Sequence, residues 1–274
     1  MYKRFLFALD LEGVNNVVGK PYEGLNSSDD YAVAINQAAL EINAAAKALF
    51  EIGAEKVDLW DNHGGGGNLK QNQLDSRVKL LNVDKIAPRM NFAKGKYDCI
   101  CFFGYHTMEG TLGGVLAHTM NSKEHQFYKI NGKYIGEIDI DSAIAAEHSM
   151  PSIFFVGGDL TCKQAKASVP DIVTVVTKKE LSRNEAIFRN NDELLAEIKE
   201  KICVAATKEA SCNSLNFPFV FEKSFKRVET AQWHFEKYAS LSLDVDYLND
   251  NIMGKDAHTL VININTLDEF LKVI

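Results

Sequence analysis

The sequence lacks the features of several classes of protein. It has no excess of positive charge, since 30 Lys and Arg residues stand against 37 Asp and Glu residues and the formal net charge is -7. Nonspecific nucleic-acid binding depends on a basic surface that displaces counterions from phosphate, so no nucleic-acid partner is expected. Long hydrophobic runs are also missing, and the apolar stretch near the N-terminus is interrupted by Asp10 and Glu12. Such a stretch is neither a secretion signal nor a membrane span, so we expect a cytoplasmic protein with no membrane partner.

Paired cysteine motifs are missing as well. The five cysteines are an odd number and none stands in a Cys-x-x-Cys motif, while Cys99 and Cys101 alternate within an apolar run as buried strand residues do. We therefore expect five reduced thiols with structural roles. The chain has no internal repeat, and its one low-complexity segment is the run Gly64 to Gly67. With 274 residues and 46% hydrophobic content, it can bury a full core without disulfides.

Apolar runs and helical stretches alternate through the first two-thirds of the chain. Strands are predicted at 5–11, 56–63, 97–106, 151–159 and 171–177, and helices at 31–54, 141–148 and 161–167. Nearly continuous apolar strands separated by helices predict an α/β fold, with a mostly parallel sheet flanked by helices. Residues 1–184 would form this metal-binding catalytic core. Residues 185–274 would form a smaller α+β lobe that could contribute to oligomerisation and to the substrate pocket. Its predicted elements are helices at 191–210 and 267–274 and strands at 217–225 and 258–266.

Polar side chains follow the first three predicted strands. Asp10 and Glu12 end the first strand, His63 ends the second and His106 ends the third. Open parallel sheets bind ligands at the carboxyl ends of their strands, so adjacent strands would bring these side chains to one crevice. Asp10 and Glu12 are two residues apart and therefore point to the same face of an extended chain. Two carboxylates this close repel each other unless a proton or a cation lies between them.

A divalent metal ion bound between the two carboxylates is the simplest way to remove their repulsion. Mixed carboxylate and imidazole ligands suit zinc. Glu137 is a fifth candidate ligand, because it follows an Asn131–Gly132 turn that is typical of a hairpin. Three carboxylates and two imidazoles exceed what one tetrahedral zinc requires, and the set fits two metal ions bridged by a carboxylate and a water. Each residue alone has a structural alternative, such as a helix cap for an Asp or a solvated loop for a His. Their repetition at successive strand ends favours the metal site.

Five segments, taken in order, resemble the DppA-type D-aminopeptidases, a family of self-compartmentalising di-zinc peptidases. They are LDLEG (9–13), DNH (61–63), GYH (104–106), GGVLAHTM (113–120) and IGE (135–137). The resemblance covers most of residues 1–185 and becomes faint toward the C-terminus.

The resemblance implies a site, an activity and an assembly. It implies two zinc ions per chain and His118 as the catalytic histidine, with Asp10 as the bridge between the metals. The implied ligands are Asp10, Glu12, His63, His106 and Glu137. The implied substrate is a short peptide from which N-terminal residues are released, with a preference for D-amino acids. The implied assembly is a homo-oligomer in the form of a ring-stacked decamer.

Other candidate residues have plainer explanations. Without the resemblance, His118 would be expected to be a hydrogen-bonded core histidine, because it lies in an apolar, Gly-led segment. The run Gly64 to Gly67 lacks the lysine and Ser/Thr of a phosphate-binding loop, so a lid or hinge over the metal site is preferred. Lys178 and Arg183 could bind a peptide carboxylate, although exposed cations seldom have so specific a role. Four further histidines are expected at the surface: His125, His148, His234 and His258.

Metal-assisted amide hydrolysis is the function that these observations favour. Metal ions would activate a bridging water and polarise the scissile carbonyl, and His118 would handle the proton or the oxyanion. Two other functions stay open at this point. A metallohydrolase of a non-peptide substrate such as a phosphoester would use the same ligands, whereas a non-catalytic protein that binds peptides or small solutes would hold little metal.

Overall fold

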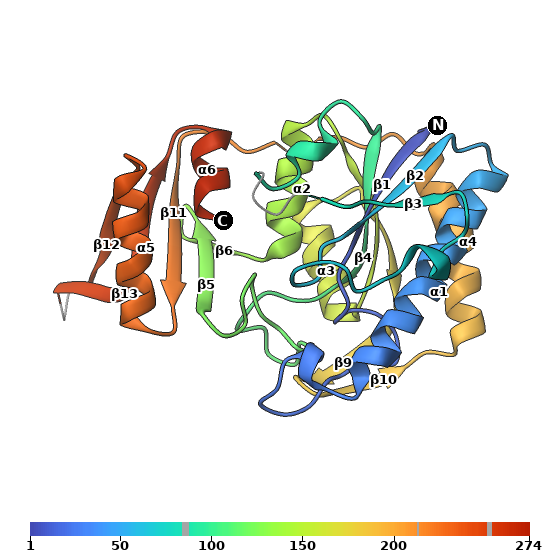
Figure 1. Ribbon diagram of the computed structural model, residues 1–274, viewed down its shortest axis with the longest axis horizontal. Helices are drawn as coiled ribbons and strands as arrows, with labels where there is room; N and C mark the ends of the chain where they lie inside the picture. Colours follow the sequence, from blue (N-terminus) through green and yellow to red (C-terminus); the bar gives the residue numbers. More distant parts are fainter. Residues whose placement is uncertain (84–87, 213, 251–253) are drawn as a thin grey trace.

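A parallel sheet forms the centre of the molecule. The computed structural model describes residues 1–83, 88–212, 214–250 and 254–274 (Figure 1). The six strands of this sheet lie in the order β3-β2-β1-β4-β7-β8, and every neighbouring pair is parallel. In chain order they are β1 (Arg4–Leu9), β2 (Lys56–Asp61), β3 (Val78–Leu80), β4 (Cys99–Tyr105), β7 (Ser152–Gly157) and β8 (Val173–Val176). The parallel arrangement brings the carboxyl ends of β2, β1 and β4 to one edge of the sheet.

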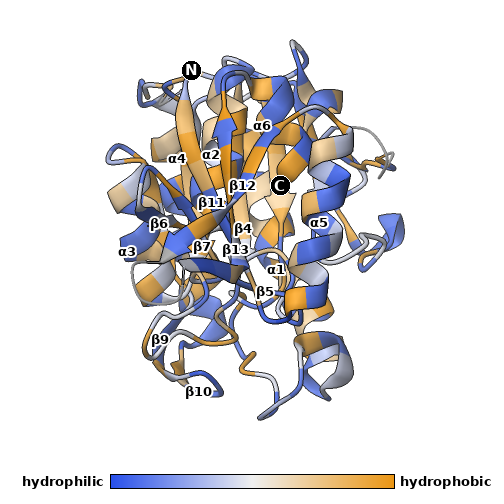
Figure 2. Ribbon diagram, turned by 90° about the vertical axis from the view of Figure 1, so that its left-hand side faces the viewer, coloured by the Kyte–Doolittle hydropathy of each residue, from blue (hydrophilic) through white to orange (hydrophobic). Residues whose placement is uncertain are grey.

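Helices cover both faces of the parallel sheet, which explains why its strands are apolar without alternation. Phe5 and Phe7 of β1 belong to the core under α1 (Asp30–Glu51) and α4 (Asn191–Thr207). Leu6 of β1 belongs to the core on the opposite face, under α2 (Glu137–Glu147) and α3 (Asp159–Ser168). Figure 2 shows the resulting band of hydrophobic strands between more polar helix surfaces. A strand buried on both faces has no polar face to present, so its residues are hydrophobic on both sides.

Helix α1 shows how the local sequence defines an element. Alanine dominates it, and this small residue has the highest helix propensity and lets the helix lie close to the sheet. The helix ends at Glu51 with Gly53 in a left-handed conformation (φ 91°). The amides of Ala54 and Gly53 donate to the carbonyls of Leu49 and Phe50 at 2.9 and 3.1 Å. This is the Schellman pattern that glycine allows after a helix.

A second, antiparallel sheet lies beside the α2 face of the first (Figure 1). Its order is β12-β13-β11-β5-β6, and its helices are α5 (Val228–Ser240) and α6 (Leu267–Val273). The strands are β5 (His125–Ile130), β6 (Lys133–Ile135), β11 (Phe219–Phe225), β12 (Asp244–Asp250) and β13 (Gly254–Ile264). Tyr128 and Phe221 of this sheet belong to the same hydrophobic cluster as Ile138 of α2, so one core joins the two sheets.

The remaining elements are short. A hairpin of β9 (Lys178–Ser182) and β10 (Glu185–Phe188) lies near the carboxyl edge of the parallel sheet. The short 3₁₀ turns are η1 (Leu25–Ser27), η2 (Gln71–Gln73) and η3 (Asn91–Ala93). All five cysteines are free, as expected. Within the described part of the chain, no helix combines the length and apolarity needed to cross a membrane.

The predicted α/β class, with a mostly parallel sheet flanked by helices and a smaller α+β part, is confirmed. The hairpin turn at Asn131–Gly132 joins β5 to β6, as predicted. The domain boundary at residues 184 and 185 stays a prediction. Strands β5 and β6 come before it and pair in the antiparallel sheet, whereas helix α4 comes after it and packs on α1.

Candidate metal centre

The carboxyl ends of β1, β2 and β4 carry the predicted ligands to one place. In the parallel register Leu9 of β1 lies beside Asp61 of β2 and Phe103 of β4, so the residues that follow each strand emerge together. Asp10 continues the pairing, because its amide donates to the carbonyl of Phe103 at 2.8 Å. The site is thus built directly from the strand register, and its first residues are as rigid as the sheet.

Two glycines make this close approach possible. Gly104 has a φ of 68°, and a Cβ built on it would lie 2.0 Å from the carbonyl oxygen of Asp10. Gly13 faces it, and a Cβ there would lie 2.1 Å from the carbonyl oxygen of Tyr105. The amide of Gly13 donates to the carbonyl of Gly104 at 2.7 Å. Any larger residue at either position would separate the end of β1 from the end of β4.

The first of two clusters consists of Asp10, Glu12 and His63, all of them buried. The Nδ1 atom of His63 lies 2.8 Å from Oδ1 of Asp10 and 3.1 Å from Oε2 of Glu12. Its other ring nitrogen, Nε2, lies 2.5 Å from Oδ1 of Asn26. Because Oδ1 of Asn26 accepts a hydrogen bond from Nε2, the lone pair of neutral His63 is on Nδ1 and faces the two carboxylates.

The second cluster consists of His106, His118 and Glu137. The Nε2 atom of His106 lies 3.3 Å from Oε1 of Glu137, and Nε2 of His118 lies 3.9 Å from the same oxygen. The two imidazole rings are stacked, with centroids 3.8 Å apart and an interplanar angle of 13°. Glu137 is the first residue of α2, and its Oε1 also accepts a hydrogen bond from the amide of Met120 at 2.7 Å.

Backbone carbonyls fix the orientation of both rings in the second cluster. Nδ1 of His106 donates to the carbonyl of Thr107 at 2.9 Å, and Nδ1 of His118 donates to the carbonyl of Leu116 at 2.9 Å. A carbonyl only accepts, so in the neutral rings the lone pairs are on the Nε2 atoms that face the carboxylates. The side chain of His106 is 1% exposed and that of His118 is 14% exposed, so His118 is the one with access to solvent.

Asp10 belongs to both clusters. Its Oδ1 faces His63 of the first cluster, and its Oδ2 lies 3.3 Å from Nε2 of His106 in the second. Burial opposes ionisation, but the His106 and His63 imidazolium groups outweigh it and hold the pKa of Asp10 well below its usual range. Burial likewise opposes charge on His63, yet the Glu12 and Asp10 carboxylates raise its pKa to about 11. Without a metal, protons therefore neutralise this group of carboxylates.

The donor set fits a pair of divalent cations. Nε2 of His106 is buried and has no hydrogen-bond partner among the described residues, although it faces two carboxylates. A buried polar atom without a partner is costly, and coordination to a cation would satisfy it. Three carboxylates and three imidazoles in two groups of three, with one carboxylate between them, match the ligand types that zinc binds. Cations would replace the protons that neutralise the site.

A buried network holds the residues that precede two of the histidines. The hydroxyl of Tyr105 donates to Oδ2 of Asp141 at 2.7 Å, and Nδ2 of Asn62 lies 3.0 Å from the Tyr105 hydroxyl. Asp141 also forms a two-point ion pair with Arg89 at 2.5 and 2.8 Å. Because Asp141 lies one helical turn after Glu137, this network connects the ends of β2 and β4 to the helix that carries Glu137.

A buried lysine holds the segment after β1. Lys178 is fully buried, and its Nζ donates to the carbonyls of Glu12, Val14 and Val17 at 2.6, 2.9 and 2.5 Å. The ammonium group thus provides the hydrogen-bond donor that these carbonyls would otherwise find in water. Lys178 is not available to a peptide carboxylate, which excludes one of the two cations that the sequence suggested for that role.

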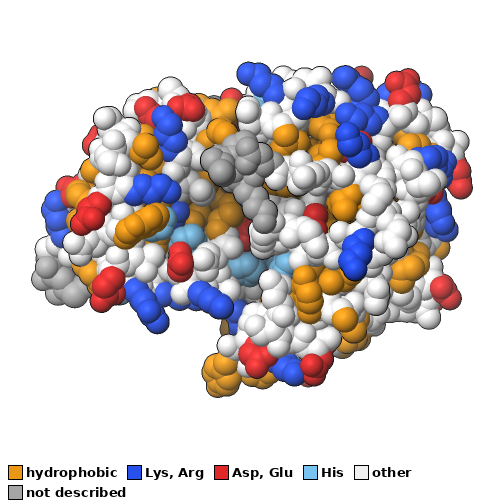
Figure 3. All heavy atoms as spheres, viewed as in Figure 1, with side chains coloured by type: hydrophobic (Ala, Val, Ile, Leu, Met, Phe, Trp, Pro, Cys, Tyr) orange, Lys and Arg blue, Asp and Glu red, His pale blue; other side chains and the backbone are white. Residues whose placement is uncertain are grey.

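The structure brings together all six residues that the sequence singled out for the site: Asp10, Glu12, His63, His106, His118 and Glu137. The assignment of five of them as ligands and of His118 as catalytic stays a prediction. Figure 3 shows histidine side chains near the middle of one face, between the parts built by the two sheets. Sequence reasoning missed Asn26, which nothing in the sequence marks. It also missed Asp141, for which the four-residue spacing from Glu137 was an available signal.

One surface prediction is wrong. His125 was expected at the surface but is 7% exposed, and its Nδ1 lies 2.9 Å from the hydroxyl of Tyr128. It lies on β5, whose sequence HQFYKI contains too many polar residues to be recognised as a buried strand. Burial and the nearby Lys223 and His234 lower the pKa of His125 to about 3. His125 is therefore a neutral core residue of the second sheet.

Known proteins resemble this chain in sequence and in fold. A family model for D-aminopeptidases (peptidase family M55) matches residues 4–242. The D-aminopeptidase of Bacillus subtilis (strain 168) is 28% identical over 147 residues, which are 53% of this chain and 52% of that protein. The match thus spans about half the length of the relative. A solved structure, the Zn-dependent D-aminopeptidase DppA from Bacillus subtilis, a self-compartmentalizing protease, has the same fold. Its TM-score is 0.82 at 19% identity, over 98% of this chain and 94% of that one.

Proposed function

Because this chain belongs to the D-aminopeptidase family, we propose that it is a zinc-dependent aminopeptidase that releases N-terminal residues, in particular D-residues, from short peptides. One observation carries the proposal: the two oxygens of Asp10 are divided between two clusters of possible ligands, at 2.8 Å from His63 and 3.3 Å from His106. A carboxylate in this position can bridge two metal ions, which supports two zinc ions per chain.

Asp10, Glu12 and His63 would hold one ion, and Asp10, His106 and Glu137 the other. When bound, zinc supplies Lewis acidity that polarises the scissile carbonyl and lowers the pKa of a bound water. The ends of the strands keep the ligands in place, since Asp10 is tied to β4 through the carbonyl of Phe103. Burial of all the ligands keeps competing water away from the reacting groups.

His118 would serve as the group that transfers a proton to the leaving amine. Its Nδ1 donates to the carbonyl of Leu116, so Nε2 is the atom available for proton transfer at the edge of the site. Its greater exposure compared with His106 lets it exchange protons with solvent and substrate. In this role His118 passes a proton to the leaving amine as the amide bond breaks.

The proposal includes an assembly, a stereochemical preference and a location. The Bacillus subtilis structure with this fold is described as self-compartmentalizing, which supports a homo-oligomer. We propose a decamer, which sedimentation or native mass spectrometry would measure directly. The preference for D-residues is supported by the names of the family and of the relative. A cytoplasmic location completes the proposal.

Elemental analysis of the freshly purified protein is the decisive experiment. Two zinc equivalents per chain are expected, together with hydrolysis of D-alanyl p-nitroanilide that a chelator abolishes and zinc restores. The L-alanyl anilide in parallel measures the stereochemical preference. Absence of bound metal would remove the basis of the proposal.

A panel of chromogenic phosphate esters separates the rival functions. Bound zinc with turnover of phosphate esters and not of anilides would identify a metallohydrolase of a different substrate. Bound peptide without chelator-sensitive turnover would identify a binding protein. Both results would contradict the proposed function.

A further inference from the structure

The β9–β10 hairpin contributes two cations near the site, with different environments. The ammonium group of Lys178 donates its three hydrogen bonds to backbone carbonyls, as described above. Arg183 lies in the turn between the strands and is exposed. The difference matters because a cation that is already satisfied cannot recruit a ligand, whereas one with free donors can.

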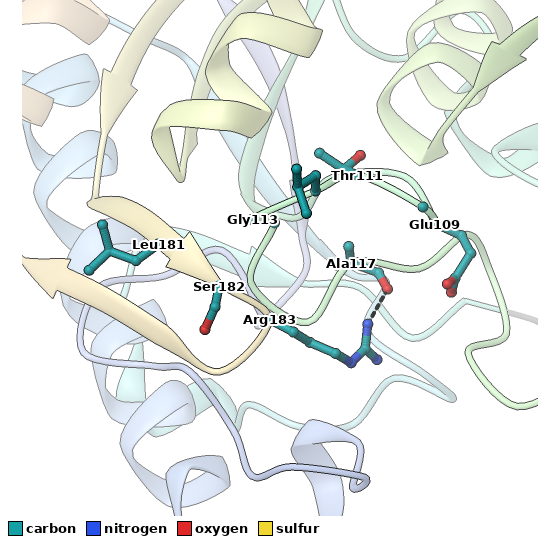
Figure 4. Close-up of a pocket in the computed structure, with 10 residues that line it drawn as sticks. Glu109, Thr111, Gly113, Ala117, Leu181, Ser182 and Arg183 are labelled. Carbon is teal, nitrogen blue, oxygen red and sulfur yellow. Dashed lines mark hydrogen bonds between the residues drawn. The ribbon is translucent and has the colours of Figure 1, made fainter.

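Arg183 is fastened to the segment that leads into His118. Its carbonyl accepts a hydrogen bond from the amide of Leu116 at 2.9 Å, and its Nη1 donates to the carbonyl of Ala117 at 2.6 Å (Figure 4). The next residue, Asn184, donates to the carbonyl of Val18 at 2.9 Å and secures the turn. The guanidinium is therefore held beside the residue that immediately precedes His118.

The guanidinium retains unused donors in a cavity of suitable size. Arg183 has five N–H donors, makes the single hydrogen bond to Ala117 and has no ion pair among the described residues. It lines a cavity of about 620 Å³ together with Glu109, Thr111 and three glycines. Glu109 lies 3.8 Å from Lys226, so the carboxylate in the lining has a cation of its own. The free edge of Arg183 is thus available to an anion.

We propose that Arg183 binds the C-terminal carboxylate of the peptide substrate, so that the enzyme prefers peptides with a free C-terminal carboxylate over peptides in which it is blocked. The inference rests on the proposed function, because it places the peptide between the metal centre and this cavity. A guanidinium presents a planar fork that matches a carboxylate with two parallel hydrogen bonds.

The hydrogen bond to Ala117 links this cavity to the metal centre. Ala117 immediately precedes His118, whose Nε2 lies 3.9 Å from Oε1 of Glu137. A peptide whose amine faces the metal ligands would direct its C-terminus past His118 toward Arg183.

Three substrates test the proposal with the zinc-loaded enzyme: the dipeptide D-Ala-D-Ala, its C-terminal amide and D-alanyl p-nitroanilide. The unmodified enzyme is expected to prefer the dipeptide over its amide by about tenfold or more in kcat/KM, mainly through KM, as a charge-assisted pair would give. Arg183→Met should lose this preference, and Arg183→Lys should keep part of it. Lys179→Met removes a cation from the same hairpin, outside the cavity lining, and should keep the full preference.

Two results would overturn the proposal: the absence of any preference in the unmodified enzyme, and an unchanged preference in Arg183→Met. An unchanged preference with an equal loss of activity on all three substrates would mean that Arg183 only supports the His118 segment. If the unmodified protein hydrolyses none of the substrates, the proposed function fails. Calorimetric titration with the dipeptide and its amide then decides the carboxylate contact, because Arg183→Met must erase any difference in affinity between them.

Discussion

The two clusters of the candidate centre differ in how the chain builds them. The first cluster comes from residues that directly follow β1 and β2, and His63 makes three contacts of 2.5–3.1 Å. The second cluster draws on the end of β4, a loop and the start of α2, and Nε2 of His106 has no contact closer than 3.3 Å to a carboxylate. A rigid, satisfied cluster thus lies beside one that is assembled from distant segments and left open.

The second cluster depends on the antiparallel sheet, whereas the first depends only on the parallel sheet. Between His118 and Glu137 the chain runs through β5 and β6, which belong to the antiparallel sheet. The position of Glu137 relative to His118 consequently depends on how the second sheet docks on α2. We infer that the first cluster holds its shape without metal, whereas the second tightens when a cation joins its ligands.

The largest expected effect comes from the residue that the clusters share. Asp10→Asn keeps the shape of the side chain but removes the charge that faces both clusters, so both zinc equivalents should be lost and kcat/KM should fall by at least about a thousandfold. Elemental analysis and anilide hydrolysis measure this. Asp171→Asn, at an exposed position, is the control. Loss of one equivalent alone would mean that Asp10 serves a single metal.

His118 and His106 form the next test, because their stacked rings lie in one cluster but are assigned different roles. His118→Ala should retain zinc near the unmodified level while kcat falls about 10²- to 10⁴-fold, the usual contribution of a general acid or base. His106→Ala should lose zinc from the second cluster. If His118→Ala also loses an equivalent, His118 is a ligand and the proton-transfer role must pass to another group.

Removal of one hydroxyl tests the network that connects the clusters. Tyr105→Phe deletes the hydrogen bond to Asp141, and zinc affinity should fall about tenfold, as for other partners that orient ligands from behind. Tyr97→Phe is a matched control, since its hydroxyl donates to Asp58 over the same 2.7 Å at the opposite end of β4. Competition with a zinc indicator measures both variants. An equal loss of zinc affinity in Tyr105→Phe and Tyr97→Phe would mean that both variants act through general destabilisation and not through the network.

The smallest effect is expected at Asn26, which touches the first cluster alone. Asn26→Ala removes the partner of Nε2 in His63 and should weaken zinc binding about threefold, since a single hydrogen bond contributes little net free energy. Stepwise zinc titration would assign the loss to one of the two equivalents. A weakening of both equivalents would contradict the separation of the clusters.

The same contrast explains what could be predicted from the sequence. The strands that position Asp10, His63 and His106 are apolar runs ended by polar residues, and they were predicted to within a few residues. Parallel register then makes their convergence a geometric consequence. The first cluster and His106 of the second follow from this argument, without knowledge of the rest of the fold.

The antiparallel sheet was harder to predict because its strands are only half buried. β5 reads HQFYKI and β12 contains three aspartates, so neither has the continuous apolar character of the parallel strands. Glu137 was expected after a hairpin, and the hairpin is present. The helix was expected from 141, but it begins at Glu137 itself, because Asp139 accepts from the Gly136 amide and caps the first turn. Contacts between distant segments, such as Asn26 with His63, leave no periodic signal in the sequence.

The enclosure of Lys178 has a consequence for experiments in solution. Its amine has no exposed surface and is surrounded by carbonyls of the segment that follows Asp10, so an acylating reagent can reach it only when that segment opens. The neighbouring Lys179 of the same hairpin is exposed and would react at once. The acylation rate of this one amine, followed by mass spectrometry, would therefore report how often the chain around the site opens. Zinc should lower this acylation rate if it binds the closed form alone.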